Sequence, residues 1–105
     1  MSLQACANLV ARADPERFAA AMSARLQARN KLLPIYAVAV EVARAPWITK
    51  EPVIAEMRLQ WWRDALEGIQ EGRLRRHEVV EPLATVLTEK GAKALDKMIL
   101  ARRWD

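Results

Sequence analysis

Glu41 is the residue with the most conspicuous chemistry, because it is the only acid within an apolar run that extends from Leu32 to Ala43. Removing a carboxylate from water costs free energy unless it is paired, so such a residue needs a partner or a function. An ion pair is the simpler hypothesis, and the candidate partners are Arg44, Arg58 and Arg63. The alternative is a functional carboxylate that lines a pocket.

A second candidate lies in the segment 58–66, which contains two adjacent tryptophans, Trp61 and Trp62. Neighbouring residues on a helix point about 100° apart, so both rings are buried only if the helix packs against two neighbours. A cation–π contact between Arg58 and Trp62 is available, because the two residues are one helical turn apart. The segment indicates the central helix of a bundle, and ligand binding is the alternative. The candidates for lining a pocket are Tyr36, Glu41, Arg58 and Trp62.

Histidine and cysteine chemistry has little support in the sequence. His77 is the only histidine and has no serine or cysteine nucleophile beside it, which argues against a catalytic triad and a histidine metal site. Cys6 is the only cysteine and forms no internal disulfide, so we expect a small buried apolar group. We therefore predict no catalytic residue and no metal ligand in the chain.

The chain is mildly basic, with a formal net charge of +4. Arginines are mixed with acids over most of the length, and the one dense cluster is Arg73, Arg75 and Arg76 beside His77. This cluster is typical of a solvated loop, and its alternative role is contact with an anionic surface such as a membrane. We expect no nucleic-acid partner.

Composition and length favour one helical domain over residues 1–105. Apolar residues make up 52% of the 105 residues and there are only three glycines, which favours helix over sheet. The longest apolar run, Leu32 to Val40, is too short to span a bilayer, and no secretory signal is visible. Because a lone thiol suits a reducing compartment, we expect a cytoplasmic protein.

Start and stop signals divide the chain into five or six helices joined by short loops. Asp14 and Pro15 form a helix start, with the aspartate as N-cap. Thr49 is the expected N-cap of the most regular helix, 50–71, and Gly72 is expected to end it. The predicted helices are, in order, 3–11, the one that starts at 14–16, 26–44, 50–71, 78–90, which ends at Gly91, and 92–104.

In two of these helices the pattern of apolar residues indicates which sides are buried. The stretch 32–43 of the helix 26–44 has apolar side chains on every side, so we expect it to be buried all round, with Pro34 as an interior irregularity. The helix 50–71 is amphipathic, with Arg63 and Glu67 as an expected i,i+4 ion pair on its wet side. Its predicted apolar stripe consists of Ile54, Met57, Trp61, Ala65 and Ile69, widened by Trp62 and Leu66.

Several segments together resemble the opening of a squalene/phytoene synthase-family protein. They are 14–18, 33–37, 51–52, 57–66 and 101–105, and Arg-Leu-Gln-Trp-Trp-Arg at 58–63 is the most specific part. The resemblance covers nearly the whole chain and implies part of an all-α isoprenoid-synthase fold, in which helices surround a central cavity. Active members join two prenyl diphosphates head to head, with Mg²⁺ held by two aspartate-rich motifs.

The sequence departs from the pattern of active members. The first aspartate-rich motif belongs at about 43–47, where the chain reads Ala-Arg-Ala-Pro-Trp, and the second belongs to a helix beyond residue 105. This departure resembles the branch that includes the mitochondrial complex I assembly factor. We therefore expect a non-catalytic helical protein that binds a protein partner or an isoprenoid or other apolar ligand, without a cofactor. The alternatives are the N-terminal part of a Mg²⁺-dependent prenyl transferase and a stand-alone helical module for an anionic surface.

A partial fold would also affect association. In the complete fold later helices would cover the apolar helix around Tyr36 to Ala43, so we expect an exposed apolar patch on it here. Because such patches mark interfaces, we predict a dimer or higher oligomer, with exchange of helices as one way to form it.

Overall fold

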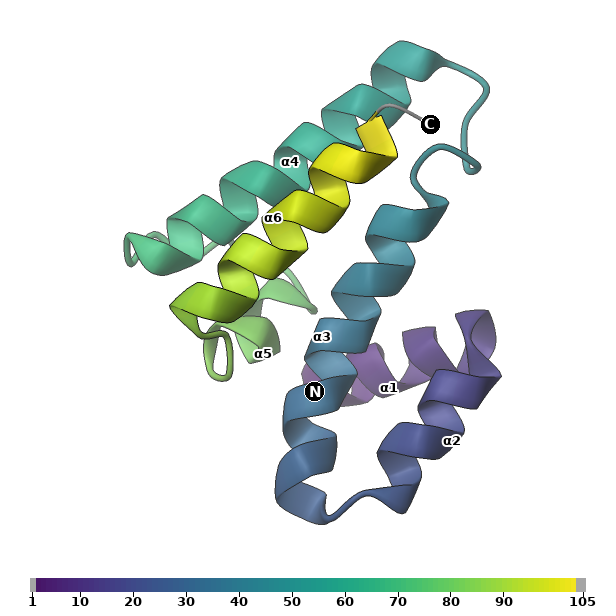
Figure 1. Ribbon diagram of the computed structural model, residues 1–105, viewed down its shortest axis with the longest axis vertical. Helices are drawn as coiled ribbons and strands as arrows, with labels where there is room; N and C mark the ends of the chain where they lie inside the picture. Colours follow the sequence, from purple (N-terminus) through teal and green to yellow (C-terminus); the bar gives the residue numbers. More distant parts are fainter. Residues whose placement is uncertain (1, 104–105) are drawn as a thin grey trace.

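The chain folds as a bundle of helices (Figure 1). The computed structural model describes residues 2–103, with side chains described from 3 to 102. This range contains six helices and no strand: α1 (Ser2–Ala13), α2 (Pro15–Ser23), α3 (Leu26–Arg44), α4 (Pro52–Gln70), α5 (Val80–Ala84) and α6 (Glu89–Arg103). None of these described helices has the length and apolarity that a membrane crossing requires. The predicted all-α class is confirmed, and Trp104, the last predicted helical residue, lies outside the described part.

The central helix is α3, and the other helices lie around it (Figure 1). On one side α1 and α2 pack against it and against each other, while α5 and α6 contact it elsewhere along its length. The long helices α4 and α6 lie antiparallel and in contact, and α4 is joined to α3 mainly through α6 (Figure 1). The consecutive helices α3 and α4 therefore diverge after the connection 45–51, and a groove lies between them.

Capping residues and prolines mark the helix starts, and one of the predicted caps is wrong. Asp14 caps α2 as predicted, because its Oδ1 accepts a backbone N–H at 3.2 Å and Pro15 is the first helical residue. The predicted cap Thr49 is wrong, because α4 begins at Pro52. Thr49 Oγ1 accepts instead from the N–H of Glu51 at 3.1 Å, in the turn before the helix. Proline disfavours helical backbone in the residue before it, so α4 starts at the proline.

The C-terminus of α4 is a glycine-ended turn, as predicted. Gly72 has a φ of 79°, a left-handed conformation that residues with a Cβ adopt only at a cost. The turn brings the N–H of Arg73 to within 2.7 Å of the Gly68 carbonyl oxygen. A Cβ on Gly68 would lie 2.5 Å from the Arg73 carbonyl oxygen, so this close approach also requires glycine at 68. The chain is thereby reversed, and the segment 73–79 folds back toward α4.

The predicted helix 78–90 is wrong. Between residues 78 and 88 only α5 is helical, and α6 begins at Glu89, before the expected break at Gly91. The reason is a threonine cap, because Thr88 Oγ1 accepts from the N–H of Gly91 at 3.0 Å. Gly91 therefore lies in the first turn of α6 and does not end a helix.

The core is built around α3. This helix is continuous through Pro34, and its burial is confirmed for most of its second half. The expected exposed patch at Tyr36 to Ala43 is wrong, because α1, α2, α5 and α6 cover the helix and only Ala43 in this stretch is exposed. The buried apolar residues of α3 are Leu33, Ala37, Val38, Ala39, Val40 and Val42.

The apolar stripe predicted on α4 is buried only toward its C-terminal half. Trp62 and Leu66 are buried, whereas Ile54 is 43% and Met57 is 65% exposed. Leu59, which lies outside the predicted stripe, is 2% exposed. Ile54 and Met57, in the early turns of α4, line the groove between α3 and α4, where no helix covers them, and this explains their exposure.

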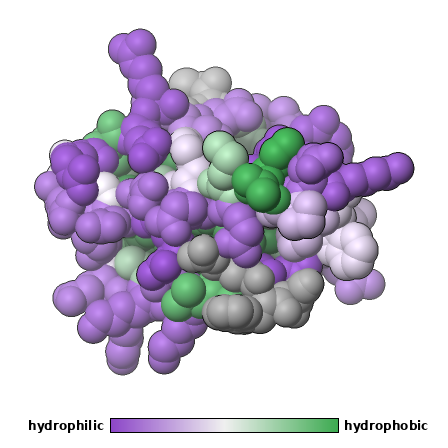
Figure 2. All heavy atoms as spheres, turned by 90° about the horizontal axis from the view of Figure 1, so that it is seen from above, coloured by the Kyte–Doolittle hydropathy of each residue, from purple (hydrophilic) through white to green (hydrophobic). Residues whose placement is uncertain are grey.

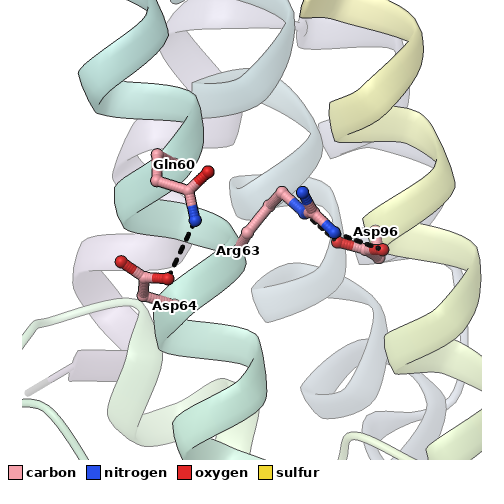
Figure 3. A network of polar contacts seen from close by, with 4 residues as sticks. All are labelled: Gln60, Arg63, Asp64 and Asp96. Carbon is pink, nitrogen blue, oxygen red and sulfur yellow. Dashed lines mark hydrogen bonds and ion pairs between the residues drawn. The ribbon is translucent and has the colours of Figure 1, made fainter.

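The ion pair predicted for Arg63 has a different partner. Arg63 Nε donates to Asp96 Oδ1 at 2.7 Å, from α4 to α6, and Glu67 one turn away is not paired with it (Figure 3). The hydrogen bond to Asp96 raises the pKa of Arg63 above its ordinary value. Elsewhere on α4, Gln60 Nε2 donates to Asp64 Oδ1 at 2.9 Å (Figure 3). The two long helices are therefore joined by a charged contact as well as by apolar packing.

Candidate ligand-binding groove

The main candidate site is the groove between α3 and α4, which has a volume of about 610 Å³. This volume is in the range usual for small-molecule sites. Its walls combine aliphatic and aromatic side chains with basic groups and one carboxylate. The lining residues are Glu41 and Arg44 of α3, Ile54, Met57, Arg58, Trp61 and Trp62 of α4, and His77 of the connection 71–79.

Three rings pack together at the groove. The rings of Trp61 and Trp62 are nearly perpendicular, with centroids 5.0 Å apart. The His77 ring lies 5.1 Å from the first and 5.4 Å from the second. Trp62 is buried and Trp61 is half-buried. The connection that carries His77 thus supplies the second neighbour that adjacent tryptophans on a helix need.

Hydrogen bonding defines the tautomer of neutral His77. Its Nδ1 accepts from the backbone N–H of Val79 at 3.0 Å. The proton of the neutral ring is then on Nε2, which is left as a donor. From the sequence His77 was expected only in a loop; the available signal was Gly72, which reverses the chain and returns this loop to α4.

The basic groups of the groove differ from the predicted arrangement. Arg44 and Arg58 are exposed and line it from opposite helices. The predicted contact of Arg58 with Trp62 is wrong, since the guanidinium of Arg75 lies over Trp61 instead, 5.2 Å from the ring centroid. The fold-back of 73–79 places this arginine on the exposed ring.

Glu41 lies on the groove but is not paired. Within residues 3–102 it forms no ion pair with any of the three predicted arginines, so that prediction is wrong. Arg63 is bound to Asp96, and Arg58 lies across the groove on the diverging helix. The carboxylate is half-buried and open to the groove, which reduces the need for a partner.

Other predicted site residues lie away from the groove. Tyr36 does not line the groove, and the guanidinium of Arg17 lies over its ring, 5.7 Å from the ring centroid. In the basic cluster, Arg73 forms an ion pair with Glu71, Arg75 covers Trp61, and Arg76 is exposed.

Comparison with known protein families identifies the family of the chain. The family model of squalene/phytoene synthase matches residues 10–105, which include every groove residue. The chain belongs to the squalene/phytoene synthase family. No curated protein and no solved structure matches it. The six helices agree with the isoprenoid-synthase-like fold expected for the family.

The Mg²⁺ used by active squalene/phytoene synthases does not fit the groove residues. Mg²⁺ takes oxygen ligands, usually including one or two carboxylates plus substrate phosphates. Among the described residues, Glu41 is the only carboxylate that lines the groove, and Arg44 and Arg58 line it too. Among the side chains of residues 3–102, no three of the His, Cys, Asp or Glu type are grouped so that they could hold a metal ion.

Proposed function

We propose that this chain is a non-catalytic member of the squalene/phytoene synthase family whose groove binds an apolar chain that ends in an anionic group. The composition of the groove supports the proposal. Ile54, Met57 and the tryptophans offer apolar surface, and Arg44, Arg58 and His77 offer donors. An apolar chain gains free energy by leaving water for such walls, and an anionic end gains from charge-assisted hydrogen bonds.

The position of Arg44 supports binding without metal. Arg44 falls within 43–47, where the resemblance to active members would place the first aspartate-rich motif, and it lines the groove. A guanidinium there can contact an anion directly, whereas a carboxylate would need Mg²⁺ between itself and the anion. The absence of aspartates at 43–47, together with Arg-Leu-Gln-Trp-Trp-Arg at 58–63, is our reason for placing the chain near the branch that includes the complex I assembly factor, and for proposing a protein partner as a further role.

Farnesyl diphosphate is a suitable probe for the full 105-residue chain. We expect saturable quenching of tryptophan fluorescence on titration, with the same affinity in Mg²⁺ and in EDTA, and no release of diphosphate. Substitution of both Arg44 and Arg58 by Ala should weaken binding about tenfold or more, because two charged donors are lost. Arg25→Ala, which removes one charge from an exposed position outside the groove, is the control and should bind like the unaltered chain.

Each outcome bears on one part of the proposal. Release of diphosphate that depends on Mg²⁺ would show that the chain is a transferase and not a binding protein. Fluorescence that changes without saturation, or that is indifferent to the double substitution, would show that the groove is not the site.

A further inference from the structure

Five large apolar side chains are exposed at one end of the molecule, in the connection before α4 and in its first turns. Trp47 is 80%, Val53 69% and Met57 65% exposed. Ile48 and Ile54 are 40% and 43% exposed. Tryptophan, valine and methionine side chains are usually buried to a much greater extent. A group of such residues that is exposed together is typical of an interaction surface. We call these five residues the apolar tip.

Arg44 lies between two parts of the apolar tip. Val53 and Met57 are one turn apart on α4, so their side chains lie on one face. Met57 lines the ligand groove together with Arg44. Arg44 also lines, with Trp47, a smaller groove of about 340 Å³ beside α2 and α3. Because Arg44 borders both grooves, it joins the Trp47 side of the tip to the Met57 side.

Basic side chains accompany the apolar tip. Arg44, Lys50 and Arg58 are all exposed. Of the nearby acids, Glu41 is half-buried in the ligand groove, and Asp14, which lines the smaller groove, is paired with Arg17. Glu56 lines the opposite side of α4 with Arg102, and Glu51 is exposed within the connection. Seen from this end, hydrophobic atoms form islands between hydrophilic ones (Figure 2).

We infer that the apolar tip docks on a membrane surface that contains anionic lipid. Tryptophan is enriched at the boundary between headgroups and acyl chains, and aliphatic side chains insert there. Cations between them attract lipid phosphates. A second copy fits less well, because a stable interface buries about 800 Å² per partner around a centre depleted of charge, whereas the exposed Arg44, Lys50 and Arg58 accompany these apolar residues.

This inference can be tested apart from the proposed ligand, although Ile54 and Met57 of the apolar tip also line the ligand groove. Trp47, Lys50 and Val53 do not line the ligand groove. Binding of farnesyl diphosphate should therefore be unchanged in Trp47→Ser, and the two proposals can fail separately.

Sedimentation of the full chain with vesicles tests the inference. We expect binding to vesicles of phosphatidylcholine mixed with phosphatidylglycerol, little binding to phosphatidylcholine alone, and weakening by salt. Trp47→Ser should weaken binding about tenfold, because the most exposed apolar group is lost. Lys50→Ala should weaken it about fivefold, the effect of one basic residue near an anionic surface. Both residues are exposed, and circular dichroism would show that the variants are folded.

Matched controls come from the opposite end of the molecule. Leu26 is 64% exposed where α2 joins α3, far from the apolar tip (Figure 1). Leu26→Ser and Lys31→Ala, another exposed position, should bind vesicles like the unaltered chain.

Several results would overturn the inference. Equal binding to neutral and anionic vesicles would remove the role of charge, and an equal loss in Leu26→Ser would remove the role of the apolar tip. If Trp47→Ser instead separates a dimer and vesicles bind nothing, the surface is an interface between copies. If substitution of Arg73, Arg75 and Arg76 by Ala abolishes binding and Trp47→Ser does not, the membrane surface lies elsewhere.

Discussion

Arg63 lies one turn from Glu67 on α4, yet its guanidinium contacts Asp96 on α6. Sequence spacing identifies partners along a helix, but it contains no information on which side chain another helix will present. Arg75 and Trp61 show the same effect, because their contact depends on the chain reversal at Gly72. At the scale of single residues, the residues with notable chemistry could be predicted from the sequence, and most of their partners could not.

The Arg63 contact leads to a stability prediction. Its two side chains are 33% and 36% exposed, so the pair is partly screened by water. We expect Asp96→Asn to lower the free energy of unfolding by about 1 kcal/mol or less, and by a smaller amount at high salt. Glu67→Gln is the control and should change the free energy of unfolding by less than about 0.5 kcal/mol. Urea denaturation of the single and double variants, in a double-mutant cycle with Arg63→Gln, measures the coupling energy of the pair. Coupling of Arg63 to Glu67 and not to Asp96 would contradict the observed contact.

Cys6 gives a prediction of reactivity. The residue is buried, its Sγ donates to the carbonyl oxygen of Glu78 at 3.9 Å, and burial raises the pKa of the thiol to about 11. Since the thiolate is the reactive form, its population near pH 8 is about a hundredfold below that of an exposed cysteine. Reaction with a disulfide reagent should be slow in the native chain and complete in urea. Rapid native labelling would show that α1 opens readily.

At the scale of helices, the threonine that caps a helix is not the one that was predicted. Thr49 was the predicted cap and Thr88 was placed inside a helix, yet Thr88 caps α6 and Thr49 holds only a turn. Proline at 52 sets the start of α4 more strongly than the threonine does, since it fixes the backbone of the first turn. The ends marked by proline and by Gly72 were predictable; the short α5 was not, because tertiary packing holds it.

Thr88→Ala should therefore lower the free energy of unfolding by about 1 kcal/mol, because a capping oxygen is lost from α6. Thr88→Ser retains that oxygen and should restore most of the loss. Thr49→Ala serves as the comparison, with an expected change below about 0.5 kcal/mol. Thermal or urea unfolding gives the free energy of unfolding of the three variants. A larger loss of stability in Thr49→Ala than in Thr88→Ala would show that the caps are wrongly assigned.

At the scale of the whole molecule, one core extends from α1 through α3 to α4, α5 and α6. The helix α5 has only five residues, too few for a helix to be stable alone, so its formation depends on that core. The same core covers the apolar helix α3 and removes the patch from which a dimer was predicted. Self-association stays a prediction, and light scattering on the full chain tests it.

Leu83 of α5 is fully buried and provides a test of this continuity. Leu83→Ala should lower the free energy of unfolding by about 2–5 kcal/mol, because it leaves a cavity in the shared core. Tryptophan fluorescence, to which Trp61 and Trp62 of α4 contribute, and far-ultraviolet circular dichroism should lose their signals in one transition. Leu74→Ala, at a position 55% exposed, is the control and should cost under about 1 kcal/mol. Two separate transitions would show that α5 unfolds on its own.

The sequence by itself determined the helical class, the family and the burial of α3, because these follow from composition, motifs and the period of apolar residues along one segment. The absence of carboxylates at 43–47 was also readable in advance. Only the tertiary structure decided that α3 and α4 diverge, that His77 returns to the tryptophans, and that Trp47, Val53 and Met57 stay exposed. Local patterns specify which faces are apolar, whereas the angles between helices decide which of those faces find a partner.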